Sequence, residues 1–141
     1  MIQNRSVPPC PVIPVLYYPD PGVAAEWLRK AFGFRVRMRI ANHRIQMKAE
    51  GGCFVVAECK QPLPDQAVMA GVQSVLVRVE DAAAHCEHAR QNGATILAEP
   101  VDHFYGERQY SAADFAGHRW SFTQSIADKE PEEWGGTSVE L

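Results

Sequence analysis

The sequence has no excess of positive charge and no long apolar run. Its 141 residues carry a formal net charge of −3 at pH 7. That balance gives no electrostatic basis for binding nucleic acid or an anionic membrane surface. No apolar stretch is long enough to span a bilayer. We therefore expect neither nucleic acid nor a membrane among the partners.

Several signature motifs are also absent. There is no glycine-rich phosphate loop, no G-x-S-x-G elbow and no H-E-x-x-H helix. The four cysteines form no C-x-x-C pair, which favours reduced thiols in a cytosolic protein. Residues 1–14 lack the apolar segment of a signal peptide. These absences predict a cytoplasmic location.

The composition is that of an ordinary globular domain, with 46% hydrophobic and 22% charged residues. The chain repeats itself, since its two halves align without a gap when Val15 is set against Val75. Each half then predicts a strand, an acidic turn, a helix and a glycine at the helix end. The matched pairs are Leu16 with Leu76, Asp20 with Glu80, Ala24 with Ala84, and Gly33 with Gly93.

Three further strands follow each predicted helix, which gives β-α-β-β-β twice. The fold class predicted is α+β, with two tandem modules forming a curved mixed sheet with a concave cleft and helices on the convex side. Module one spans residues 12–60, a linker 61–70 and module two 71–126, within one domain of residues 1–126. An acidic tail, residues 127–141, carries Trp134. Free sheet edges predict a homodimer.

Four short segments are the most specific in the sequence: Tyr105-Gly106-Glu107-Arg108, Asp114-x-x-Gly117-His118-x-Trp120, Ala25-Glu26-Trp27-Leu28 and Phe32-Gly33-Phe34. With the repeat, they resemble the vicinal oxygen chelate superfamily, the glyoxalase, bleomycin-resistance and dioxygenase group, over residues 12–126. Phe115 stands where the family usually has proline after the turn aspartate.

The resemblance implies, for many members, a metal held on the first and last strands of each half. Strand alternation places Ser74, Leu76 and Arg78 in the cleft, and the repeat places Pro14, Leu16 and Tyr18 there too. Because Trp120 and Phe122 take the helix side, Ser121 faces the cleft. The implied ligand positions then fall on Pro14, Ser74 and Ser121, with a fourth near Val56 or Glu58.

Proline and serine are poor ligands for hard divalent ions, so we predict a metal-site-deficient branch with no cofactor. His85 and His88 share a helix face, which we interpret as solvated. The predicted cleft suits a planar or amphiphilic small organic ligand held by stacking and one charged contact. The predicted binding residues are Leu16, Tyr18, Phe54, Glu58, Ser74, Leu76, Arg78, His103, Tyr105, Arg108 and Ser121.

These residues also have structural interpretations. Leu16, Phe54 and Leu76 can simply fill space, and Tyr18 can pack at a dimer seam. Arg78 can pair with Glu80 or Glu107, and Arg108 can form a structural ion pair.

Three functions stay open at this point. The first is a metal-free binder of the bleomycin-resistance kind that sequesters a drug or metabolite. The second is a lyase, isomerase or dioxygenase-type enzyme, either with an atypical metal site on Glu58 and His103 or with acid-base residues alone. The third is a partner-binding module that uses the Trp134 tail.

Overall fold

A computed structural model describes residues 2–65 and 71–140. The chain divides into two compact units, Met1–Met69 and Ala70–Leu141, and each is described by itself. The predicted linker falls partly outside the described residues, at positions 66–70. Among the described residues, no helix has the length and apolar character needed to cross a membrane.

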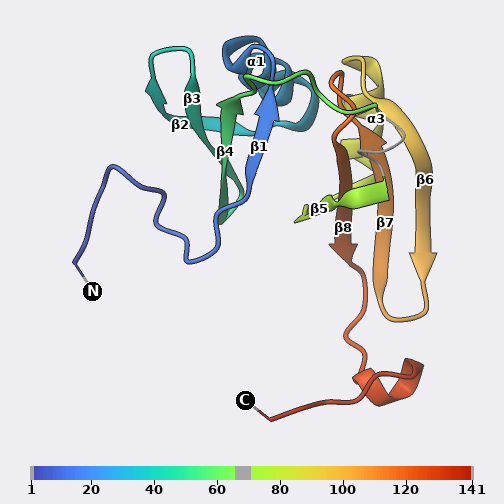
Figure 1. The fold of residues 1–141 in the computed structure, drawn as a ribbon. Helices are drawn as coiled ribbons and strands as arrows, with labels where there is room; N and C mark the ends of the chain where they lie inside the picture. Colours follow the sequence, from blue (N-terminus) through green and yellow to red (C-terminus); the bar gives the residue numbers. More distant parts are fainter. Residues whose placement is uncertain (1, 66–70, 141) are drawn as a thin grey trace. The chain divides into compact units, whose positions relative to one another are not determined.

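The first unit is one helix on a four-stranded sheet (Figure 1). Strand β1 pairs in parallel with β4, and the β4–β3 and β3–β2 pairs are antiparallel, so the sheet order is β1-β4-β3-β2. The elements are β1 (Val15–Tyr18), α1 (Pro21–Phe32), β2 (Arg35–Ile40), β3 (Arg44–Ala49) and β4 (Gly52–Glu58).

The second unit repeats this arrangement with sheet order β5-β8-β7-β6. A short 3₁₀ helix, η1 (Pro131–Trp134), follows the last strand. The predicted α+β class with two tandem β-α-β-β-β modules is confirmed, with one four-stranded sheet in each module. The elements are β5 (Ser74–Arg78), α3 (Ala82–Gln91), β6 (Thr95–His103), β7 (Glu107–Ala113) and β8 (Arg119–Ser125).

Both helices begin at an aspartate. The Asp20 carboxylate accepts a hydrogen bond from the Val23 amide at 3.2 Å, and the Asp81 carboxylate accepts one from the Ala84 amide at 3.0 Å. Asp20 therefore corresponds to Asp81. The gapless alignment, which paired Asp20 with Glu80, is one residue out at this point.

The same one-residue error makes the predicted orientation of β1 wrong. Leu16 pairs with Val56 of β4, and Tyr18 is two positions further along the same face. That face of the sheet is covered by α1. Leu16 is 3% exposed and Tyr18 is 0% exposed. The prediction that these side chains line an open cleft is wrong, because a one-residue slip moves a strand's side chains to the opposite face.

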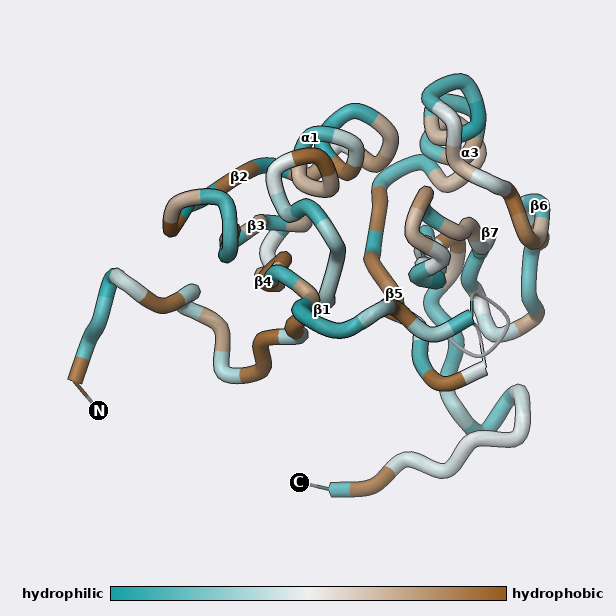
Figure 2. The backbone as a smooth tube through the Cα atoms, turned by 45° about the horizontal axis from the view of Figure 1, so that its top comes forward, coloured by the Kyte–Doolittle hydropathy of each residue, from teal (hydrophilic) through white to brown (hydrophobic). Residues whose placement is uncertain are grey.

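Phe54 shares this helix-covered face. Its ring contacts Phe34 edge-on at 5.3 Å, and Phe34 contacts Phe32, the last residue of α1, at 5.7 Å. Phe54 is 2% exposed, so its predicted place in the cleft is also wrong. In Figure 2 both helices carry brown and teal segments in turn, as expected where one side of a helix packs on a sheet.

The core of the second unit lies between α3 and the sheet. Trp120, Phe122 and Tyr110 are each at most 1% exposed. The His85 ring packs on Phe122 at 4.3 Å, and its Nδ1 is hydrogen-bonded to the Tyr110 hydroxyl. The solvated face predicted for the two helix histidines is therefore wrong for His85.

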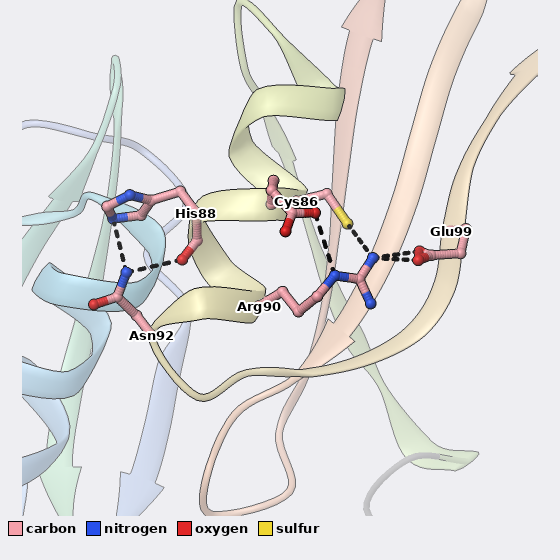
Figure 3. A network of polar contacts seen from close by, with 6 residues as sticks. Cys86, His88, Arg90, Asn92 and Glu99 are labelled. Carbon is pink, nitrogen blue, oxygen red and sulfur yellow. Dashed lines mark hydrogen bonds and ion pairs between the residues drawn. The ribbon is translucent and has the colours of Figure 1, made fainter.

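Polar contacts also join α3 to β6. Figure 3 shows the Arg90 guanidinium between the Cys86 thiol and the Glu99 carboxylate. The distance from Arg90 Nη2 to Glu99 Oε2 is 2.7 Å. Burial raises the pKa of the Cys86 thiol, and the nearby Glu99 charge adds to that effect.

Candidate functional site

The second sheet has one face that α3 does not cover. Cross-strand pairing puts Leu76 beside Ser121 and Ser121 beside Ser111, opposite in direction to the buried Trp120 and Phe122. Leu76 is 60% exposed. We call this surface the Ser121 face. Ser74, Leu76, Arg78 and Ser121 face away from the helix, as predicted, and their place in a ligand cleft stays a prediction. The residues of the Ser121 face are Ser74, Leu76, Arg78, Glu107, Gln109, Ser111, Ser121, Thr123 and Ser125.

Hydrogen bonds connect the polar side chains of the Ser121 face. The Ser111 and Ser121 hydroxyls lie 2.9 Å apart. The Gln109 amide donates to the Thr123 hydroxyl at 3.1 Å, and that hydroxyl donates to Glu107 at 2.6 Å. These groups hold one another in fixed positions, so the face offers an ordered set of hydroxyl and amide groups.

Opposite charges lie at one end of this network. Arg78 Nη1 donates to the Ser125 hydroxyl at 2.6 Å. The pKa of Glu107 is lowered, first by the hydrogen bond from Thr123, then by one from Ser125 and by the Arg78 charge. Glu107 is therefore a carboxylate at neutral pH. Sequence reasoning offered Glu107 as a partner for Arg78, and the Ser125 hydroxyl is the direct partner found.

An aromatic cluster lies at the β6–β7 turn. The His103 ring stacks on Tyr105 at 4.9 Å with only 7° between the ring planes. The Tyr105 hydroxyl donates to Gln109 at 2.9 Å, which ties this cluster to the Ser121 face. The structure thus brings the predicted residues His103 and Tyr105 next to the hydroxyl and amide network.

The tail docks on this same turn. The Gly106 carbonyl accepts from the Ile126 amide at 2.8 Å and from the Ala127 amide at 3.3 Å. The Trp134 ring lies 5.3 Å from Tyr105. Trp134 is therefore docked on its own chain.

Arg108 lies on the other side of this sheet. It alternates with Glu107 and Gln109 along β7, and its guanidinium pairs with Asp102 at 2.6 Å. That ion pair lowers the pKa of the Asp102 carboxyl. The predicted place of Arg108 in the cleft is therefore wrong, and its structural interpretation as an ion-paired residue holds.

The first sheet also has a face that its helix does not cover. A hollow of about 410 Å³ opens there, and we call it the Tyr17 hollow. Tyr17 is 50% exposed, and its aromatic side chain forms part of the lining. Glu58, a predicted site residue, borders this hollow. The lining residues are Tyr17, His43, Arg44, Ala57, Glu58 and Lys60.

The donor groups on the Ser121 face do not suit a metal ion of the kind that the family resemblance implies. Among residues 2–65 and 71–140, no three His, Cys, Asp or Glu side chains gather closely enough to hold one. On the Ser121 face the donors are neutral hydroxyls, an amide and Glu107, whose carboxylate is bound by Thr123. Divalent transition metals prefer imidazole, thiolate or several carboxylates.

Several residues of the Ser121 face and of the Tyr17 hollow were not predicted from the sequence. Gln109, Ser111 and Thr123 were not singled out, although alternation with the buried Tyr110 and Phe122 points to them. Tyr17 was missed because the register of β1 was one residue out, and Arg44, at the start of β3, was not singled out. Matching the two capping aspartates, Asp20 and Asp81, would have given the correct register.

Comparison with known proteins identifies the family of this fold. The profile described as Glyoxalase/Bleomycin resistance protein/Dioxygenase superfamily matches residues 12–122. The chain belongs to this superfamily. The comparison with curated proteins gave no significant match.

Solved structures of the superfamily share the fold. TioX from Micromonospora sp. ML1 is 30% identical, with a TM-score of 0.67 over 84% of this chain and 98% of TioX. A bleomycin-binding protein complexed with bleomycin is 19% identical, with a TM-score of 0.63 over 81% of this chain and 97% of that protein. The fosfomycin resistance protein FosX from Listeria monocytogenes is 12% identical, with a TM-score of 0.64 over 89% of this chain and 95% of FosX.

Proposed function

We propose that this superfamily member binds a small organic molecule without a metal ion and sequesters a drug or metabolite. The Ser121 face carries the proposal. Its hydroxyl and amide groups bond to one another, and Ser121 lies on β8, the last strand of its module, where a metalloenzyme of this superfamily is expected to place a ligand. Such groups orient an organic ligand through hydrogen bonds, and they are weak ligands for a divalent ion.

The Tyr17 hollow supports a ligand that is aromatic and carries an anionic group. The half-exposed Tyr17 ring offers a stacking surface. Arg44 and Lys60 border the same hollow and together outweigh the single carboxylate of Glu58. A guanidinium binds a planar carboxylate or a sulfonate through paired hydrogen bonds.

Two relatives support the ligand class. One was crystallised with bleomycin bound, and the other is a fosfomycin resistance protein. At 19% and 12% identity they share the fold with this chain, so the particular antibiotic does not transfer. A role in sequestering an organic molecule is what this likeness suggests.

We also propose a homodimer in the cytoplasm. Strands β1 and β2 are the outer strands of the first sheet, and β5 and β6 are those of the second. Outer strands have unpaired backbone groups, which favour pairing with a second copy. Light scattering should give twice the chain mass. A monomer mass at every concentration would overturn this part of the proposal.

The binding test compares two ligands of opposite charge, and two arginine variants on opposite faces of the first sheet. We expect naphthalene-1-sulfonate to raise the melting temperature, and the cationic 1-naphthylmethylammonium to raise it less. By calorimetry, Arg44→Ala should weaken sulfonate binding about tenfold, equivalent to about 1.4 kcal/mol. Arg39→Ala is the control, since Arg39 pairs with Ile45 on the helix-covered face. Equal effects of the two variants would contradict the proposed site.

The same comparison applies to the second unit. Arg78→Ala removes a cation from the Ser121 face, whereas Arg108→Ala removes one from the other side of that sheet. We expect only Arg78→Ala to weaken ligand binding. Loss of binding in Arg108→Ala alone would show that the ligand occupies the helix side.

The alternative enzyme needs a metal held by Glu58 and His103. The His103 ring is already stacked on Tyr105, and Glu58 borders the Tyr17 hollow. Under the binding proposal, Glu58→Gln and His103→Ala leave the metal content at background level. A stoichiometric metal lost from both variants, together with a lyase or dioxygenase activity, would replace the binding proposal by the enzyme.

A further inference from the structure

Two cysteines far apart in the sequence meet in the first unit. The sulfur atoms of Cys10 and Cys53 lie 2.9 Å apart, although 43 positions separate the residues. Both are free thiols in this structure. A disulfide bond is about 2.05 Å long, so only a small approach of the two sulfurs is required to form one.

The contact belongs to a longer docked segment, which we call the arm (residues 4–14). Arg37 Nη2 donates to the Arg5 carbonyl at 2.8 Å, and Gln46 Nε2 donates to the Ser6 carbonyl at 2.8 Å. At the other end of the arm, the Val55 amide donates to the Pro14 carbonyl at 2.9 Å. These bonds hold the arm to β2, β3 and β4 on both sides of Cys10, so the sulfur contact is fixed from either direction.

The two thiols differ in their access to solvent. Cys53 is only 7% exposed, and burial, followed by the Cys10 thiol, raises its pKa. Cys10 is half-buried at the surface of the arm. A reagent in solution therefore reaches Cys10 first, and Cys53 is placed to react in the second step.

We propose that Cys10 and Cys53 are a redox pair that forms a disulfide and locks the arm onto the first sheet. The oxidant is a small disulfide such as oxidised glutathione. The Cys10 thiolate attacks one sulfur of that disulfide, which forms a mixed disulfide and releases one thiolate. The Cys53 thiolate then attacks the Cys10 sulfur, forms the protein disulfide and releases the second thiolate. One small disulfide is reduced to two thiols for each pair of protein thiols oxidised.

The other two cysteines provide controls within the same chain. The Cys59 thiol donates to the Gln61 carbonyl at 2.7 Å, and Cys86 lies against Arg90 at 3.9 Å. Neither has a sulfur partner among the contacts described for residues 2–65 and 71–140. The proposal therefore assigns the oxidation to Cys10 and Cys53 alone.

The proposed disulfide lies on the same face of the first sheet as the Tyr17 hollow. Cys53, Val55 and Ala57 alternate along β4 on the face that α1 does not cover, and Ala57 lines the Tyr17 hollow. A disulfide at Cys53 fixes the arm at the start of the strand whose end borders the hollow. This inference stands apart from the proposed function, since the disulfide can form whether or not a ligand binds.

The test uses the full chain equilibrated in reduced and oxidised glutathione, then denatured and alkylated. The reduced protein should take four labels and the oxidised protein two. Before alkylation, the oxidised protein should have an intact mass lower by two hydrogen atoms. Cys59→Ser should keep the disulfide, and Cys10→Ser should lose it. Oxidation should raise the melting temperature of the wild type by several degrees and leave that of Cys10→Ser unchanged.

Three results would overturn the proposal. One is four labels at every glutathione ratio. Another is a disulfide that persists in Cys10→Ser. The third is oxidation that yields only covalent dimers on a non-reducing gel. Because Cys10 is half-buried in the arm, Cys10→Ser tests the pair without disturbing the buried Cys53 position.

Discussion

Asp114 holds the turn between β7 and β8 through three hydrogen bonds. One carboxylate oxygen accepts from the Ala116 and His118 amides, each at 3.0 Å, and the other accepts from the Trp120 indole at 3.1 Å. Asp114 is 5% exposed. This explains why the segment that carries the family resemblance is so specific: one side chain shapes the turn and orients the core tryptophan.

Asp114→Asn tests that role. An asparagine oxygen can still accept from the two amides, but its NH₂ group faces the Trp120 indole and leaves that donor unpaired. We expect the free energy of unfolding to fall by about 2 kcal/mol in urea denaturation. The exposed Asp128→Asn is the control and should change it by less than about 0.5 kcal/mol. Equal values for the two variants would contradict this account of the turn.

Glu107 should give the second unit a pH-dependent stability. Its pKa is lowered in the folded state, chiefly by the Thr123 hydrogen bond. The stabilisation is therefore complete above the pKa of an unfolded glutamate, about 4.3, and is lost as the pH falls through the lower folded value. Melting temperatures of Glu107→Gln should decline less steeply in acid than those of wild type. Glu140→Gln, with an exposed side chain, should follow the wild-type curve.

At the scale of single residues, part of the candidate site could be predicted from the sequence. Ser121 and Arg78 could be placed on the open face because the bulky Trp120 and Phe122 define the opposite one. The hydroxyl network could not be predicted, because it depends on the cross-strand register that brings Ser111 beside Ser121.

The register of β1 decides what the first unit presents to a ligand. Residues Val15–Tyr18 read Val-Leu-Tyr-Tyr, with no charged residue to mark the wet face, so alternation alone could not fix their direction. The helix caps carry the missing information, since Asp20 and Asp81 perform the same role. Because of this one-residue difference in spacing, Tyr18 was predicted in the candidate site, whereas the structure places Tyr17 there.

Neighbouring tyrosines test this register directly. Tyr18→Ala removes a ring that is 0% exposed and should cost about 4 kcal/mol of unfolding free energy. Tyr17→Ala removes a half-exposed ring and should cost about 0.5 kcal/mol or less, while weakening ligand binding. Chemical denaturation of both variants decides the matter. A larger stability loss in Tyr17→Ala would reverse the faces described for β1.

Gly106 ties the tail to the β6–β7 turn. Its φ of 91° is left-handed, and an added Cβ would lie 2.4 Å from the Ala127 carbonyl oxygen. Gly106→Ala should destabilise the protein by about 2 kcal/mol and speed hydrogen exchange at the Ile126 and Ala127 amides. Gly135→Ala is the matched control, with a φ of 100° and no atom within 4 Å of its new Cβ. Equal exchange rates in both variants would argue against a docked tail.

At the scale of the whole molecule, the repeat and the family could be read from sequence because both rest on local signals. The helix stop at Gly33 and the turn at Asp114 are each set by residues a few positions apart in the sequence. The candidate binding surfaces depend on long-range pairing, and the contact between Cys10 and Cys53 has no local signal at all. The same fold hosts both binders and enzymes, so function rests on the side chains of the open faces.

The central claim is that the chain binds an organic ligand without a metal. The direct measurement is the affinity for naphthalene-1-sulfonate before and after exhaustive chelation, with metal analysis of the same samples. We predict no stoichiometric transition metal and an unchanged dissociation constant. A stoichiometric metal whose removal abolishes binding, or a lyase or dioxygenase activity lost with it, would contradict the account.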